Sequence, residues 1–141
     1  MARKDEKLEL LRRIPLFAGL NRRQIERLGQ LTDEVDIPAG RVLMRQGDRG
    51  DELFIVVEGE LRIERDGRSV AVRMPGDFVG EIALVDHGPR TATVTAAQPT
   101  RVLVVGHRAF NTLMDEFPGV RLEVLRALAQ RVRAAEPEAA H

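Results

Sequence analysis

The sequence contains no cysteine among its 141 residues, which excludes a disulfide framework and any metal site built from thiolates. An oxidising compartment is therefore not indicated, and we expect the protein in the cytoplasm. No apolar run approaches the roughly 20 residues that a membrane span needs. The first residues, MARKDEKLELLRR, also lack the apolar core of a signal peptide. We expect no membrane segment.

The chain also lacks net charge, with 22 basic and 22 acidic side chains. A nucleic-acid-binding protein usually has a basic excess on one face. The local excess of four positive charges between Met1 and Arg27 is typical of a solvated helix surface, so DNA binding is not expected from this chain. The apolar content of 43% and the length suit one domain with its own core.

Residues 1–31 have the pattern of an N-terminal helical segment. Leu8, Leu11 and Ile14 recur at three-residue steps and predict a short helix that ends at Pro15. Asn21 and Gln24 then form a capping-box pattern at the start of a second helix. The buried stripe of that second helix is expected at Ile25, Leu28 and Leu31.

Residues 32–106 have the pattern of a β domain, because short apolar runs alternate with glycine-containing turns. Asp66-Gly67 is a strong hairpin signal between two of these runs. Many short strands at even spacing favour a sandwich or a jelly-roll barrel, and periodicity alone does not choose between them. The expected strands are 42–44, 53–57, 61–65, 70–74, 93–96 and 102–105.

Residues 107–141 are expected to form C-terminal helices and a short tail. A short helix around Phe110 is broken at Phe117-Pro118-Gly119, and a longer helix runs on towards Pro137. Its apolar residues are spaced alternately by three and four positions, at Leu122, Leu125, Ala129 and Val132. We expect this row to pack against the barrel, and pairing with a second copy of the chain stays open as the alternative.

The segment GDFVGEIALVDHGPRTATVTA, from Gly76 to Ala96, contains the chemistry of an anion site. A glycine, Gly80, precedes a predicted helical turn whose free N–H groups would come from Ile82, Ala83 and Leu84. Glu81 offers a carboxylate beside these donors, and Arg90 offers a guanidinium downstream. A phosphate ester with a neighbouring hydroxyl group needs this combination of donors and one acceptor.

This segment closely resembles the phosphate-binding cassette of the cyclic nucleotide-binding domain family, with residues 76–93 as the cassette. Turn glycines at Gly40, Gly47, Gly59 and Gly76 extend the resemblance to residues 16–133. The resemblance implies a mainly β fold with flanking helices: a jelly-roll barrel (a double-stranded β-helix) with N-terminal helices and a C-terminal lid helix. It also implies that Glu81 accepts a hydrogen bond from the ribose 2′-hydroxyl and that Arg90 binds the phosphate.

The resemblance further implies how the rest of a bound cyclic nucleotide is held. Thr91 would reach the phosphate, and in some relatives a threonine here also favours guanine. Val72, Val79 and Ala92 are candidate walls for the purine. In the lid helix, Arg131 is the candidate to stack near the base, with Arg126 and Arg133 as competitors. The choice between cAMP and cGMP as ligand stays open.

Two functions are compatible with these observations. The first is a cAMP or cGMP sensor whose ligand moves the C-terminal helix, with no attached effector domain and an unknown effector protein as partner. The second is a degenerate domain that serves as a dimerisation or scaffold module; the retained Glu81 and Arg90 favour the first. An enzyme is not expected, because the three histidines are too scattered for a metal site and no nucleophile or Walker motif is present.

Overall fold

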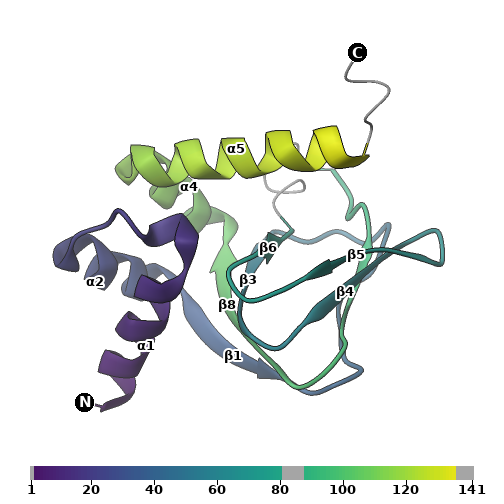
Figure 1. Ribbon diagram of the computed structural model, residues 1–141, viewed down its shortest axis with the longest axis horizontal. Coiled ribbons are helices and arrows are strands. Elements are labelled where there is room, and N and C mark those ends of the chain that lie inside the picture. Colours follow the sequence, from purple (N-terminus) through teal and green to yellow (C-terminus); the bar gives the residue numbers. More distant parts are fainter. Residues whose placement is uncertain (1, 81–87, 136–141) are drawn as a thin grey trace.

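Two four-stranded antiparallel sheets face each other, with helices gathered at one end and along one side (Figure 1). This arrangement is a computed structural model that describes residues 2–80 and 88–135. One sheet has the strand order β1-β8-β3-β6 and the other has the order β2-β7-β4-β5. The predicted mainly β fold with flanking helices is confirmed, and the strands form the predicted jelly roll.

The described elements follow each other in the predicted order of helices, strands and helices. The helical elements are α1 (Ala2–Arg13), the 3₁₀ turn η1 (Pro15–Phe17), α2 (Arg22–Leu31), α4 (His107–Glu116) and α5 (Pro118–Ala135). The strands are β1 (Asp33–Ile37), β2 (Val42–Met44), β3 (Glu52–Glu58), β4 (Leu61–Arg65), β5 (Arg68–Arg73), β6 (Phe78–Val79), β7 (Thr93–Ala96) and β8 (Thr100–Gly106). Two of them, β1 and β6, were not predicted.

The predicted capping box at the start of α2 is present. The Asn21 side chain accepts a hydrogen bond from the Gln24 amide, and the Gln24 side chain accepts one from the Asn21 amide, both at 2.9 Å. These bonds satisfy two N–H groups that would otherwise lack partners at the helix start. The predicted hairpin is present too, because Asp66 and Gly67 both have left-handed φ values, of 54° and 78°, between β4 and β5.

The core has two parts that share strands β3 and β8. One face of these strands packs against the helices, where Leu53 and Ile55 meet Phe17, Leu28 and other buried side chains. The opposite face packs against the second sheet, with Phe54 among the contributors. A strand that is buried on both faces needs a continuous apolar run, which explains why 53–57 does not alternate with polar residues.

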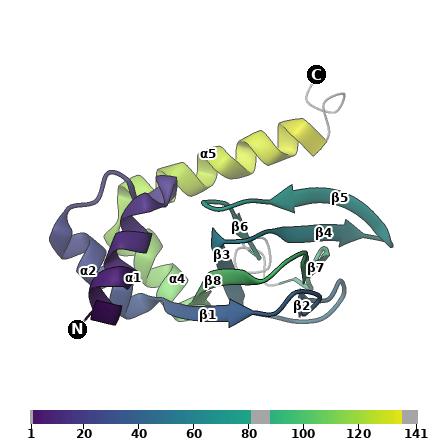
Figure 2. The same ribbon diagram turned by 60° about the horizontal axis from the view of Figure 1, so that its bottom comes forward.

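Helix α5 buries a different face from the one predicted. Leu122, Leu125 and Val132 are exposed at 47%, 57% and 60%, and Ala129 is exposed as well. The buried face instead carries Val120, Val124, Ala127 and Leu128. Phe117 is the single residue between α4 and α5 and is itself buried in the same core. The prediction that Leu122, Leu125, Ala129 and Val132 pack against the barrel was therefore wrong. Figures 1 and 2 show α5 lying along the β5–β6 side of the barrel.

Candidate functional site

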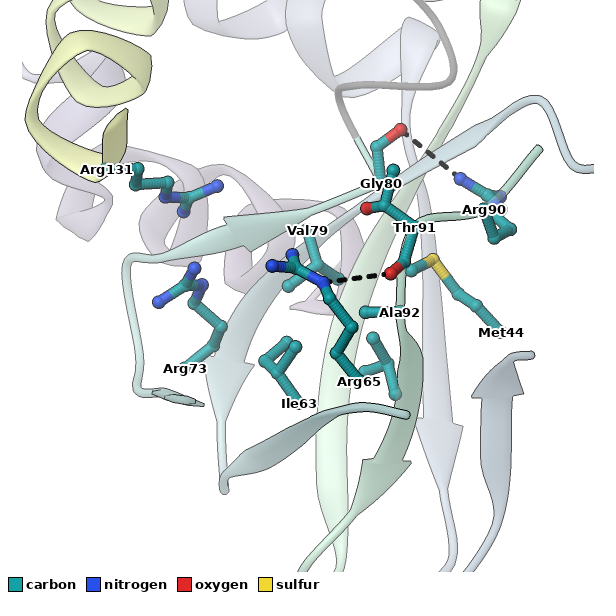
Figure 3. Close-up of a pocket in the computed structure, with 11 residues that line it drawn as sticks. Met44, Ile63, Arg65, Arg73, Val79, Gly80, Arg90, Thr91, Ala92 and Arg131 are labelled. Atoms are coloured by element: carbon teal, nitrogen blue, oxygen red, sulfur yellow. Dashed lines mark hydrogen bonds between the residues drawn. The ribbon is translucent and has the colours of Figure 1, made fainter. Parts of the chain in front are cut away.

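A cavity of about 70 Å³ opens between the two sheets and the inner side of α5 (Figure 3). It lies where the strands β4, β5 and β6 approach the residues that precede β7. Its walls combine apolar side chains with four arginines. The lining residues are Met44, Ile63, Arg65, Arg73, Val79, Gly80, Arg90, Thr91, Ala92, Val94 and Arg131. Six of these were predicted as site residues from the sequence.

The guanidinium of Arg90 is buried at one end of this cavity, and the side chain is only 6% exposed. Its Nη1 donates a hydrogen bond to the carbonyl oxygen of Gly80 at 3.2 Å, and its Nη2 donates to that of Glu52 at 3.0 Å. The Arg90 amide also donates to the carbonyl oxygen of Asp48 at 2.8 Å. These contacts hold a permanent positive charge out of water, where it attracts an anion more strongly than a surface charge does.

Two glycines leave room for the Arg90 side chain. Gly80 has a φ of +94°, and a Cβ atom there would lie 2.6 Å from the carbonyl oxygen of Glu52 and 3.0 Å from Arg90 Nη1. A Cβ atom at Gly50 would lie 2.5 Å from Arg90 Nη2. Gly80 was predicted from the sequence but Gly50 was not, since only the folded chain brings Gly50 beside the arginine.

Arg131 reaches the cavity from α5, which places one of the three competing C-terminal arginines at the site. Its Nη2 donates to the carbonyl oxygen of Phe78 at 2.6 Å, and its guanidinium lies 4.3 Å from the centre of the Phe78 ring. Arg126 instead pairs with Glu123 at 2.7 Å on the surface, and Arg133 is exposed.

The other predicted residues fall into three groups. Val79 and Ala92 are buried and line the cavity, and Thr91 lines it while its backbone carbonyl accepts a hydrogen bond from Arg65 Nε at 3.1 Å. Val72 does not line the cavity: it is 44% exposed, because alternate β5 residues point to opposite sides of the sheet and place Arg73 inside. Glu81, Ile82, Ala83 and Leu84 lie outside the described residues.

Arg65 and Arg73 also line the cavity, although neither was predicted. On β4, Arg65 has the same alternation as the buried Ile63, and Arg73 is paired with Leu61 across the β4–β5 ladder. Regular pairing counted back from the Asp66-Gly67 turn would place Val72 opposite Leu61. The register shift between the Glu64–Ser69 and Ile63–Ala71 pairs places Arg73 there instead, so the sequence carried no local signal for Arg73. Within residues 2–80 and 88–135, no helix is long and apolar enough to cross a membrane, and no cluster of three potential metal-ligating side chains occurs.

The chain belongs to the cyclic nucleotide-binding domain family, because residues 34–117 match the sequence model of that family. The resemblance inferred from the cassette is thereby confirmed. The family is a regulatory binding domain of a non-catalytic kind.

Individual relatives share the domain within longer proteins. The chain is 32% identical over 130 residues to the CRP-like cAMP-activated global transcriptional regulator of Mycobacterium tuberculosis, which covers 89% of this chain and 58% of the relative. It is 33% identical over 116 residues to the cAMP-dependent protein kinase regulatory subunit of Mycosarcoma maydis, covering 76% of this chain and 22% of the relative.

Among solved structures, the catabolite activator protein of Thermus thermophilus is similar, with a TM-score of 0.79 and 31% identity. The match covers 88% of this chain and 61% of that chain. The present chain therefore spans little more than half the length of the bacterial relatives described here.

Proposed function

We propose that this chain is a sensor domain that binds cAMP or cGMP in the arginine-lined cavity and transmits binding through α5. The observation that carries the proposal is the buried guanidinium of Arg90 beside Gly80 at the cavity end. A cyclic nucleotide carries one negative charge on its phosphodiester, and a buried guanidinium gives this charge a strong partner. Relatives named for cAMP activation and for cAMP-dependent regulation support the same ligand class.

In the proposed complex, the phosphate is bound by Arg90 together with the N–H groups of Ile82, Ala83 and Leu84. Glu81 accepts a hydrogen bond from the ribose 2′-hydroxyl. The sequence motif supports both of these assignments. The purine extends along Val79 and Ala92 towards Arg131, which lines the cavity from α5.

Binding requires the cavity to widen, because about 70 Å³ is well below the roughly 300 Å³ at which ordinary ligand pockets begin. The elements that border the cavity include the β4–β5 hairpin, the residues before β7, and α5. A ligand that favours a widened arrangement shifts the equilibrium between two positions of α5 by its difference in affinity for them. We propose this shift as the signal, read by an effector outside residues 1–141.

Calorimetric titration of the purified chain with cAMP and with cGMP tests the proposal. We expect binding of at least one nucleotide, and at least about a tenfold loss of affinity in Arg90→Ala, because the phosphate charge loses its buried partner. Arg62→Ala is the matched control, since Arg62 lies on the outer side of β4 and pairs with Glu64 at 2.8 Å. Equal affinities for the wild type and Arg90→Ala would refute the assignment of this cavity.

A second candidate function, self-association, is favoured by the exposed row of Leu122, Leu125, Ala129 and Val132 on α5. Their alternating spacing is that of the a and d positions of a coiled coil. Sedimentation equilibrium of the wild type and Leu125→Gln tests it. A dimer that dissociates in the variant supports the second candidate, and a monomeric wild type at all concentrations excludes it.

A further inference from the structure

The side chain of Gln46 joins two turns that lie apart in the sequence. Gln46 closely follows β2, and Asp66 is in the turn between β4 and β5. Gln46 Nε2 donates a hydrogen bond to Asp66 Oδ1 at 2.9 Å, and Gln46 Oε1 accepts one from the Asp66 amide at 2.8 Å. A single amide side chain, which has both donors and an acceptor, therefore binds the carboxylate and the backbone of one residue in the hairpin turn.

These two hydrogen bonds act on a residue with an unusual backbone. Asp66 has a φ of 54°, in the left-handed region that residues other than glycine seldom adopt. Because the amide and the carboxylate of Asp66 bind Gln46 together, they favour one orientation of this residue over the others. Gln46 thereby helps to fix the tip of the β4–β5 hairpin.

The backbone of the same turn is bonded to the segment that carries the buried guanidinium. The Gln46 amide donates to Thr93 Oγ1 at 3.0 Å, and the Gly47 amide donates to the carbonyl oxygen of Arg90 at 2.9 Å. The Arg90 amide donates in return to the carbonyl oxygen of Asp48 at 2.8 Å. The turn after β2 is therefore attached to both ends of the segment from Arg90 to Thr93.

The β4–β5 hairpin contacts this segment as well. Arg65 Nε donates to the carbonyl oxygen of Thr91 at 3.1 Å, as Figure 3 shows. Arg65 and Thr91 both line the cavity, so this bond joins two of its walls. The turn after β2, the hairpin and residues 90–93 thus form one bonded group, in which the Gln46 side chain connects the first two.

We propose that Gln46 is a positioning residue for ligand binding: its side chain holds the tip of the β4–β5 hairpin beside the segment that carries Arg90, and so sets the separation of two cavity walls. The inference rests on the proposed function. Gln46 is not among the described residues that line the cavity, so it acts through these two segments. Without the side chain, the hairpin tip has fewer anchors, and binding a ligand must also order the tip, which lowers the affinity.

Calorimetric titration of Gln46→Glu with cAMP and with cGMP tests the inference. The substitution keeps the size of the side chain but replaces its donor by a second carboxylate beside that of Asp66, and like charges repel. We expect the affinity to fall about threefold to tenfold, the effect of losing roughly one hydrogen bond. Gln98→Glu is the matched control for the added charge, since Gln98 is exposed in the turn between β7 and β8. We expect it to bind as the wild type does.

A second substitution, Asp66→Asn, is expected to rescue the first. In the double variant Gln46→Glu/Asp66→Asn, the new amide donates to the new carboxylate, and the backbone amide of residue 66 keeps an acceptor. Asparagine also tolerates the left-handed conformation of this turn. We expect the double variant to recover an affinity within about twofold of the wild type. A general effect of negative charge near the cavity would not be reversed in this way to the level of the Gln98→Glu control.

Hydrogen–deuterium exchange of the ligand-free chain tests the anchoring separately from binding. In Gln46→Ala we expect faster exchange in residues 65–68 and 90–93 than in the wild type, and unchanged exchange in β3 and β8. Unchanged exchange in residues 65–68 would overturn the anchoring role, whatever the affinities are. A thermal melt checks that each variant is folded.

The outcomes of the titrations separate the inference from the proposed function. Unchanged affinity in Gln46→Glu, or a loss that Asp66→Asn does not reverse, would overturn the positioning role and leave the proposed function intact, because the wild type still binds. Failure of the wild type to bind either nucleotide would overturn the proposed function and the positioning role together.

Discussion

The guanidinium of Arg131 lies 4.3 Å from the centre of the Phe78 ring and donates a 2.6 Å hydrogen bond to the carbonyl oxygen of the same residue. One side chain of α5 is thus bound both to the ring and to the backbone of β6. Phe78 precedes Gly80 by two residues and belongs to the buried core. A displacement of α5 therefore pulls directly on the strand that leads into the proposed phosphate site.

We predict that Arg131→Met loosens about the last three turns of α5 without unfolding the barrel. A cation–π contact and a charge-assisted hydrogen bond together stabilise by about 1–3 kcal/mol, and methionine retains most of the apolar stem. Hydrogen–deuterium exchange measures the effect, and we expect faster exchange in residues 125–135 and unchanged exchange in β3 and β8. Arg133→Met is the control, since Arg133 is exposed on the same helix. The same exchange rates in Arg131→Met and the wild type would contradict this role.

Lys7 caps the C-terminal end of α2 from a neighbouring helix. Its Nζ donates to the carbonyl oxygen of Gly29 at 2.7 Å and to that of Thr32. Carbonyl groups at a helix end lack partners within the helix and carry partial negative charge, so an ammonium group is favourable there. We predict that Lys7→Met lowers the free energy of unfolding by about 1–2 kcal/mol. Urea denaturation measures it, with the exposed Arg12→Met on α1 as control; equal stability of both variants would contradict the capping role.

Gly59 and Gly67 allow backbone strain to be separated from steric clash. Both have positive φ values, of +96° and +78°. A Cβ atom at Gly67 meets nothing within 4 Å, whereas one at Gly59 would lie 2.5 Å from Thr100 Oγ1 and 2.7 Å from the carbonyl oxygen of Pro99. We predict that Gly67→Ala costs about 1 kcal/mol from the left-handed conformation alone, and that Gly59→Ala costs about 1–3 kcal/mol more. Similar unfolding free energies for the two variants would show that the clash relaxes.

The parts of the fold that the sequence predicts are those encoded by local chemistry. The capping box at Asn21 and the turn at Asp66-Gly67 each depend on a few neighbouring residues, and both are present. Strand β1 was missed because three of its five residues are acidic, and its pairing with β8 is a long-range contact. The rotation of α5 could not be predicted from local spacing either, since the helix carries two apolar rows and only tertiary packing buries the one that contains Val120 and Val124.

The site was predictable to the extent that the cassette encodes it. Arg90, Gly80 and Thr91 lie at the cavity, and Arg131 was identified with two competitors that local spacing did not eliminate. The prediction for Val72 was wrong by one position along β5. Val72, predicted as a cavity wall, faces outwards, and its neighbour Arg73 faces the cavity. Gly50 had no signal in the sequence, because its importance arises from an arginine 40 residues away.

Gly50 offers a test of whether Arg90 must be held in place. An added Cβ atom would meet the guanidinium of Arg90, at 2.5 Å from Nη2 and 2.7 Å from Cζ. The guanidinium is the far end of a flexible side chain, so it moves aside more easily than the backbone does. We predict that Gly50→Ala weakens cyclic nucleotide binding at least about tenfold and lowers the unfolding free energy by about 1–3 kcal/mol, since a displaced guanidinium loses its hydrogen bonds to the carbonyl oxygens of Gly80 and Glu52.

Calorimetry and urea denaturation of the same preparation separate these two effects of Gly50→Ala. Gly19→Ala is the control, because a Cβ atom there meets nothing within 4 Å and should change neither quantity. If Gly50→Ala bound nucleotide as tightly as the wild type, Arg90 would tolerate displacement and its geometry in the ligand-free chain would not determine affinity. If the unfolding free energy fell by much more than about 3 kcal/mol, the glycine would support the loop before β3 rather than only the orientation of the arginine.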